Sequence, residues 1–212
     1  MPASPHFAIF LSAAVLLAIA PGPGMLYVLA RSLAGGKREG VLSAVGTFIG
    51  GMAHVFAAAA GISLILAKSA LAFACLKYAG AGYLCFLGVR MIRDARRDRD
   101  ADAGEASAAL LPVRNPLWQG VATEALNPKT ALFFLSFIPQ FVSRQNGHVF
   151  WQFLLLGTIS VVLNTSADLI VIVLAGPIGA KIRSSTRFRR RQRIATGLVM
   201  IGLGAYVAVG DR

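Results

Sequence analysis

Charged residues are scarce in this chain. Asp, Glu, Lys and Arg make up 14% of its 212 residues, against about 25% in an average soluble domain. Hydrophobic residues make up 56%, and the mean hydropathy is +0.67. This balance excludes a disordered chain, and it supplies more apolar side chains than a water-facing surface can hide. The composition therefore predicts an integral membrane protein.

Cysteine and the common catalytic motifs are also lacking. The two cysteines, Cys75 and Cys85, lie within an apolar stretch and form no C-x-x-C pair, which argues against a disulfide framework and a redox pair. No P-loop, H-E-x-x-H or G-x-S-x-G motif occurs, so ATP hydrolysis and the commoner metal and nucleophile chemistries have no support. We therefore expect no metal, no cofactor and no enzymatic activity.

Six apolar runs are present instead. A helix needs about 20 residues to cross a bilayer, and lipid restricts spanning structures to helices and closed barrels. The runs predict an all-α fold of six transmembrane helices in a single membrane domain that fills residues 1–212. They cover residues 7–33, 41–67, 71–92, 117–142, 149–175 and 194–209, and the fifth is expected to stop at Gly176-Pro177.

The net charge of +12 indicates topology rather than nucleic-acid binding, because of where the charges lie. Sixteen of the 21 Lys and Arg residues lie in or beside the loops after the first, third and fifth runs, whereas four lie on the opposite side. Loops rich in Lys and Arg stay in the cytoplasm. The pattern therefore predicts a multi-pass protein of the cell membrane, with lipid as its surroundings and both termini outside.

A charged segment divides the chain into two halves. Residues 93–116 alternate Arg and Asp and then turn to Ala and Ser, as expected for a solvated cytoplasmic linker. Repeat one covers about residues 5–92 and repeat two about residues 117–212, with three runs in each. An odd number of spans in each half forces opposite orientations in the membrane. The sequence therefore predicts two inverted three-helix repeats.

Proline interrupts the first run of each repeat, at Pro21-Gly22-Pro23-Gly24 and at Asn127-Pro128-Lys129. A helix that restarts after such a break points unpaired N–H groups and its positive dipole end inward, which suits a carboxylate. Matching interruptions in inverted repeats are typical of the binding site of a secondary transporter. Alternatively, the prolines only kink the two helices. The candidate substrate-binding residues are Pro21, Gly22, Pro23, Gly24, Asn127, Pro128 and Lys129.

A few ionisable residues lie inside the runs, where a charge is costly. Candidates for binding a substrate ammonium group or a coupling proton are Glu124, Asp168, Asn164 and His54. Asn164 and Asp168 are four residues apart and share one helix face. Two structural alternatives stay open: an ion pair between Glu124 and Lys129, and an interhelical hydrogen bond for His54. Two functional alternatives also stay open: an intramembrane enzyme that uses His54, Glu124 and Asp168, and a structural membrane subunit.

The residues at the breaks resemble those of a known family. Pro21-Gly22-Pro23, the glycines of the second run around His54, and a run that reads N-P-K-x-x-L-F-F-x-x-x-x-P-Q-F from Asn127 to Phe141 are similar to the LysE/RhtB family of amino-acid exporters. The longer run is the more specific of these features. The resemblance covers essentially the whole chain, including its length and its central charged segment.

This resemblance implies a secondary transporter of the bacterial inner membrane that exports amino acids or close derivatives, driven by the proton motive force. Its partners would be an amino acid, protons and the lipid bilayer. The family motif positions carried over are Pro21, Gly22, Pro23, Asn127, Pro128 and Lys129. A bundle of six helices also leaves room for a homodimer.

Overall fold

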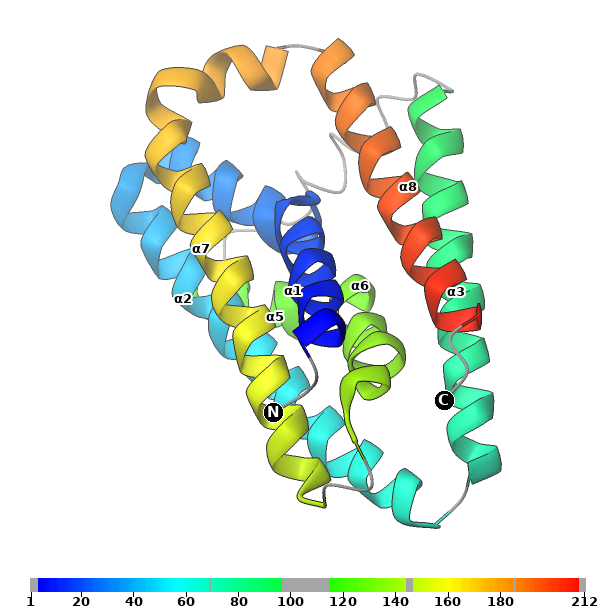
Figure 1. Cartoon of the computed structure of the whole chain (residues 1–212). Helices are drawn as coiled ribbons and strands as arrows, with labels where there is room; N and C mark the ends of the chain where they lie inside the picture. The colour runs from blue at the N-terminus through cyan, green and yellow to red at the C-terminus, as the bar shows by residue number, and fades with distance from the viewer. Residues whose placement is uncertain (1–3, 69, 97–114, 144–146, 185, 210–212) are drawn as a thin grey trace.

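The chain is described here by a computed structural model that covers residues 4–68, 70–96, 115–143, 147–184 and 186–209 (Figure 1). These residues form helices joined by short turns, and no strand occurs among them. The predicted all-α class is confirmed. Residues 97–114, which make up most of the predicted charged linker, lie outside the described residues.

The first half contains three helices, α1 (Ser4–Ile19), α2 (Pro23–Lys68) and α3 (Ala70–Arg96). The predicted break at Pro21 is confirmed, because residues 20–22 separate α1 from α2. Helix α2 is itself divided at Gly36, whose φ of 73° lies in a region that glycine occupies without a steric penalty. The second apolar run begins after this turn.

The second half begins with a helix that is also broken. Helix α5 (Pro116–Ala125) ends before α6 (Pro128–Leu132), which continues as a π-helical segment, η1 (Phe133–Phe137), and a 3-10 segment, η2 (Ile138–Phe141). The predicted interruption at Pro128 is therefore confirmed. Two longer helices follow, α7 (Val149–Ser184) and α8 (Thr186–Val209).

The predicted end of the fifth apolar run agrees with the segment able to cross a membrane, which ends at Ala175. The helix itself does not end there, because α7 continues past Gly176-Pro177 to Ser184. A proline inside a helix removes one hydrogen bond and bends the axis, but the helix can resume beyond it. Figure 1 shows the last part of α7 turning sideways at one end of the molecule. By length and composition, two described segments are able to cross a membrane, Pro23–Gly61 and Val149–Ala175, and Phe7–Ile19 and Ile194–Val209 are shorter apolar helices.

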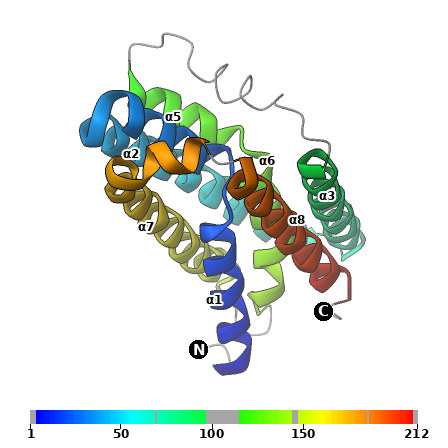
Figure 2. The same cartoon turned by 90° about the horizontal axis from the view of Figure 1, so that it is seen from above.

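The helices form two groups with a shared core. Helix α2 packs against α5 and α7, and α3 packs against α8. Helix α1 and segment η1 lie between the two groups (Figures 1 and 2). The core between them is aromatic, and Phe10, Phe133, Phe137 and Phe153 are fully buried in it.

The exposed surface is apolar and the interior holds polar groups. Leu16, Ile19 and Leu155 expose 52%, 65% and 63% of their surface, whereas Asp168 exposes 0% and Glu124 exposes 3%. A water-soluble protein rarely has this distribution, because large exposed apolar patches favour association or membrane insertion. The surface is suited to contact with lipid tails.

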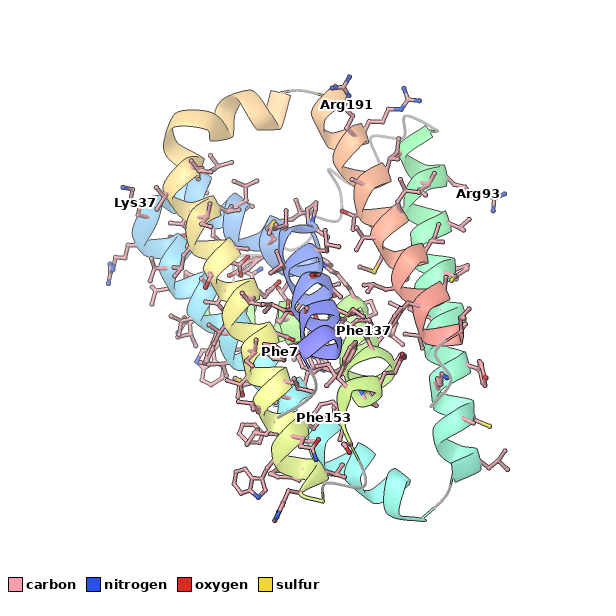
Figure 3. All side chains as sticks on the ribbon, viewed as in Figure 1. Phe7, Lys37, Arg93, Phe137, Phe153 and Arg191 are labelled. Carbon is pink, nitrogen blue, oxygen red and sulfur yellow. The ribbon has the colours of Figure 1, made fainter. Side chains whose placement is uncertain are left out.

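The basic residues gather toward one end. Figure 3 labels Lys37, Arg93 and Arg191, which lie toward the same end of the molecule. They come from the segments after the first, third and fifth apolar runs. The spatial arrangement thus agrees with the charge count made from the sequence.

Glycines let the helices cross closely. A Cβ added at Gly120 of α5 would lie 2.6 Å from the main-chain oxygen of Ser43 and 3.1 Å from the Cα of Gly46, both in α2. A Cβ added at Gly197 of α8 would lie 2.6 Å from the main-chain oxygen of Gly88 in α3. These contacts leave no room for a side chain, so each helix pair depends on its glycines.

We expect Gly46→Ala to destabilise the protein by about 1–3 kcal/mol, because the new methyl group meets the backbone of α5. Gly82→Ala is the matched control, since nothing lies within 4 Å of a Cβ at Gly82 and alanine favours a helix by roughly 0.5–1 kcal/mol. Thermal unfolding in detergent measures both. Equal melting temperatures for the two variants would contradict the close crossing of α2 and α5.

Candidate functional site

The break at Pro21 frees a main-chain carbonyl at the end of α1. In a continuous helix the oxygen of Leu17 would accept from the N–H of residue 21, but proline has none. Lys129 replaces that donor: its Nζ lies 2.9 Å from the oxygen of Leu17 and also donates to the oxygen of Ala20. The ammonium group therefore caps the negative end of α1.

The break at Pro128 frees the carbonyl of Glu124 for the same reason. Glu124 precedes Pro128 by four residues, so its main-chain oxygen has no helical donor. His54 Nε2 lies 2.9 Å from this oxygen, and the N–H of Asn127 donates to it at 3.0 Å. Because a carbonyl only accepts, His54 carries its proton on Nε2. Its ring stacks on Phe134, with centroids 6.3 Å apart.

The two breaks are therefore capped by the opposite halves of the chain. Lys129, from the second half, donates to a main-chain oxygen of α1, and His54, from the first half, donates to one of α5. The interhelical hydrogen bond considered for His54 is present. An ion pair between Glu124 and Lys129 is absent, and the ion pair found among the described residues joins Arg31 and Glu39 at 3.4 Å.

Glu124 has its carboxylate held at both oxygens. Asn127 Nδ2 donates to Oε2 at 3.1 Å, and Thr130 Oγ1 donates to Oε1 at 2.6 Å. Asn127 also caps α6, because its Oδ1 accepts from the N–H of Lys129 at 3.1 Å. One tight turn thus fixes the orientation of the Glu124 side chain.

The glycines of the first break let these side chains approach the backbone. A Cβ at Gly24 would collide with Oε2 of Glu124, and a Cβ at Gly22 would lie 3.1 Å from Cδ of Lys129. Gly24 lies in the first turn of α2, so the carboxylate of Glu124 is close to the positive end of that helix. Pro21 and Pro23 flank Gly22 on either side.

Asp168 lies on α7 and is completely buried. Its Oδ2 is 3.1 Å from Oγ1 of Thr47 on α2, and its Oδ1 has no hydrogen-bond partner. None of the ion pairs found within the described part of the chain involves it. The sequence did not predict a role for Thr47 or for the other hydroxyl groups of this region.

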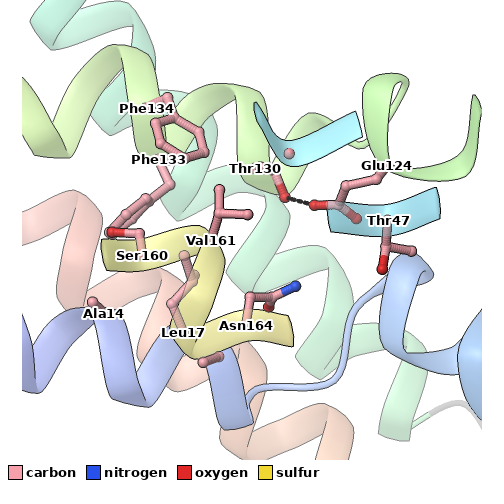
Figure 4. A pocket seen from close by; sticks show the side chains of 12 residues that line it. Ala14, Leu17, Thr47, Glu124, Thr130, Phe133, Phe134, Ser160, Val161 and Asn164 are labelled. Carbon is pink, nitrogen blue, oxygen red and sulfur yellow. Dashed lines mark hydrogen bonds between the residues drawn. The ribbon is translucent and has the colours of Figure 1, made fainter. Parts of the chain in front are cut away.

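A small cavity lies where α1, α2, α5, α6 and α7 meet (Figure 4). One part of its wall is apolar, and the other carries hydroxyl, amide and carboxylate groups. The space open to the centre of a water molecule is about 20 Å³, which is enough for water but not for an amino acid. The apolar lining includes Leu17, Phe133, Phe134 and Val161, and the polar lining consists of Thr47, Glu124, Thr130, Ser160 and Asn164.

The structure brings some of the predicted residues to this cavity and places the others around it. Glu124 and Asn164 line it directly. Asp168 reaches it through Thr47, and His54 and Lys129 adjoin it through their contacts with the two breaks. The residues that sequence reasoning missed are Thr47, Thr130, Ser160, Phe133 and Phe134. A signal was available for Thr130, which follows Pro128 within the first turn of α6.

Comparison with known proteins assigns the chain to a protein family. Its residues 15–211 match the family described as LysE type translocator. The chain belongs to this family. It is 36% identical over 192 residues to an uncharacterized membrane protein of Pseudomonas aeruginosa, covering 90% of this chain and 86% of the relative. It is 32% identical over 201 residues to an uncharacterized membrane protein of Vibrio cholerae, covering 94% of each.

A third relative, from Klebsiella pneumoniae, is named leucine efflux protein. It is 28% identical over 207 residues, which cover 96% of this chain and 94% of the relative. No solved structure matches the chain. Membership of a translocator family makes this LysE-type chain a membrane transporter and not an enzyme. The alternative of an intramembrane enzyme that uses His54, Glu124 and Asp168 is therefore excluded.

The capping of α1 predicts a stabilising role for Lys129. Removing a charged donor leaves two carbonyls without that partner, so we expect Lys129→Met to cost about 2 kcal/mol. For a chain of this size that lowers the melting temperature by roughly 4–8 °C. Lys37→Met is the control, because Lys37 is exposed and its loss should change the melting temperature little.

The capping of α5 predicts a similar effect for His54. His54→Phe keeps a ring against Phe134 but removes the N–H that reaches the oxygen of Glu124. We expect a loss of about 1–3 kcal/mol from the buried carbonyl left with one donor fewer. Unfolding by heat in detergent measures it, and a variant as stable as the parent would show that the hydrogen bond contributes nothing.

Proposed function

We propose that this protein is a secondary transporter that exports amino acids from the bacterial cytoplasm across the inner membrane, coupled to the proton motive force. The observation that carries the proposal is the cavity at the two helix breaks, which places a carboxylate, an amide and hydroxyls opposite an apolar wall. An amino acid has the matching chemistry, because it carries an ammonium group, a carboxylate and a side chain. Membership of the LysE type translocator family supports this reading.

Glu124 binds the ammonium group in this proposal. Asn127 and Thr130 donate one hydrogen bond to each of its oxygens. A carboxylate oxygen accepts about two hydrogen bonds, so each retains an acceptor site. Asn164 lines the same cavity and offers both an acceptor and donors. The substrate ammonium group binds between Glu124 and Asn164.

The substrate carboxylate binds at the first turns of the half-helices that begin at Pro23 and Pro128. The positive dipole ends of these half-helices favour an anion. Lys129 adds a positive charge next to the first break, because its side chain lies against Gly22.

The apolar wall selects the side chain. Leu17, Phe133, Phe134 and Val161 offer the substrate only hydrocarbon, so a branched aliphatic side chain gains from burial and a charged one pays for desolvation. The chain is similar to proteins named leucine efflux protein in three genera. We therefore propose leucine and amino acids of similar shape as substrates.

Alternating access follows from the size of the cavity. The cavity has room for water alone, so an amino acid enters only if the helices around the cavity move apart. The bonds from Lys129 to α1 and from His54 to α5 run between the two halves. Rocking of the halves about the breaks would open the cavity to each side in turn.

We further propose six spans in two inverted repeats. The repeats would relate α2 to α7 and α3 to α8, and each of these pairs is in contact. Proline breaks the first span in both repeats. Both features support the arrangement, since helices related by a two-fold axis lie against each other near that axis.

Orientation can be tested separately. The basic end of the molecule, which carries Lys37, Arg93 and Arg191, belongs in the cytoplasm by the positive-inside rule, and both termini then lie outside. A phosphatase fused after Arg212 should be active in intact cells, and a fluorescent protein that folds only in the cytoplasm should stay dark. The opposite pair of results contradicts the assignment.

Transport can be tested with the purified protein in vesicles. Exchange of labelled leucine should occur in the wild type, and Glu124→Gln should lower leucine affinity by about 10–100-fold, because a hydrogen bond to a charged group is worth roughly 1.5–3 kcal/mol. Glu39→Gln is the matched control, since Glu39 pairs with Arg31 at the molecular surface. Absence of exchange for every amino acid in a panel would overturn the proposed function.

A further inference from the structure

The two buried acidic residues differ in what surrounds them. Glu124 receives a hydrogen bond at each oxygen and lines the cavity. Asp168 has one hydrogen-bond partner within the described residues, the hydroxyl of Thr47 at 3.1 Å from Oδ2, and its Oδ1 has none. An ionised carboxylate with a bare oxygen is strongly disfavoured in a buried site. The surroundings of Glu124 suit an anion, and those of Asp168 suit a neutral acid.

The hydroxyl of Thr47 is compatible with a neutral Asp168. Its Oγ1 lies 3.0 Å from the main-chain oxygen of Ala44 and 3.1 Å from Oδ2 of Asp168. A hydroxyl has one hydrogen to donate, and the oxygen of Ala44 can only accept. If Thr47 donates to Ala44, the hydrogen between Thr47 and Asp168 must come from Asp168. In a protonated Asp168, the hydrogen of the carboxyl group and that of the Thr47 hydroxyl would thus each have an acceptor.

The charged groups near Asp168 do not provide it with a fixed counter-ion. On α7, Asp168 is the sole charged residue between Val149 and Ala175. Helix α2 presents the uncharged Thr47 to it, and the charges that act on it from α5 and α6 are those of Glu124 and Lys129, which have opposite signs. Neutralising Asp168 therefore requires either a proton or a further cation that enters the cavity.

We propose that Asp168 is the residue that carries the coupling proton, and that this proton and the substrate ammonium group replace each other at the polar wall formed by Thr47, Asn164 and Glu124. The assignment rests on the proposed function. Binding of the ammonium group brings a positive charge to the cavity, and Asp168 then releases its proton as the acid dissociates to carboxylate and H⁺. After the amino acid leaves, Asp168 takes up a proton from the outside.

The path between the two sites is short. Thr47 contacts Asp168 and also lines the cavity. Asn164 lies one helical turn before Asp168 on the same face of α7 and lines the cavity as well. The proton thus needs to pass only Thr47 to reach water in an opened cavity.

Proton release on substrate binding tests the proposal directly. Leucine is added to the purified protein in weakly buffered detergent with a pH-sensitive dye, and leucine binding is measured in parallel. The wild type should release about one proton per leucine bound, and Asp168→Asn should release none while still binding leucine. Binding without proton release by the wild type, or equal release by the variant, would overturn the role of Asp168.

Transport measurements distinguish failure of this proposal from failure of the proposed function. In vesicles, Asp168→Asn should lose accumulation driven by a pH gradient but retain leucine exchange within about tenfold of the wild type, and Asp168→Glu should regain part of the accumulation. Gradient-driven accumulation by Asp168→Asn contradicts the inference and leaves the export function standing. A wild type that moves no amino acid defeats the function itself.

If the Asp168→Asn variant does not fold, the proposal can be tested on the wild type. Infrared spectra at neutral pH should contain the carbonyl band of a protonated carboxylic acid, and leucine should diminish that band. A leucine-free protein without the band would overturn the proposal, because Asp168 would then be ionised before any substrate binds.

Discussion

The structure depends on how the carbonyls freed by two prolines are satisfied. Pro21 leaves the oxygen of Leu17 without a helical donor, and Pro128 does the same to Glu124. In a bilayer each unpaired carbonyl costs several kcal/mol, so a broken helix persists only where another part of the chain supplies the donor. Here each half supplies the donor for the other, through the side chains of Lys129 and His54. The breaks are therefore held next to each other, and the cavity lies beside them.

This reciprocal capping explains why one small region holds most of the buried polar groups. The turn that exposes the oxygen of Glu124 also brings Asn127 and Thr130 to its carboxylate. Gly24 lets that carboxylate lie against the first turn of α2. Asp168 lies outside this network, and its carboxyl group has a hydrogen bond to Thr47. The Glu124 carboxylate is thus held in place by hydrogen bonds, whereas the charge of Asp168 must be neutralised by a proton or by a cation that enters the cavity. An exchange of ammonium group and proton requires this arrangement.

The sequence predicted the helical class and both breaks, because the missing N–H of proline is a local property that needs no tertiary information. It could not predict that Lys129 caps α1, since Leu17 is 112 residues away and the contact depends on how the halves dock. Thr47 carries no periodic signal, so its role was visible only in three dimensions. The sequence also located the end of the fifth apolar run before Pro177, but it did not show that α7 bends there and continues to Ser184. The assignment of Pro21–Gly24 and Asn127–Lys129 to substrate binding stays a prediction.

A structure of the protein in a lipid disc with leucine bound tests the central claim most directly. The account predicts leucine between the two breaks, with its ammonium group within hydrogen-bond distance of Glu124 and its side chain against Phe133 and Phe134, in a cavity enlarged beyond the present space of about 20 Å³. Leucine bound elsewhere, with Glu124 still bonded to Asn127 and Thr130 alone, would contradict it.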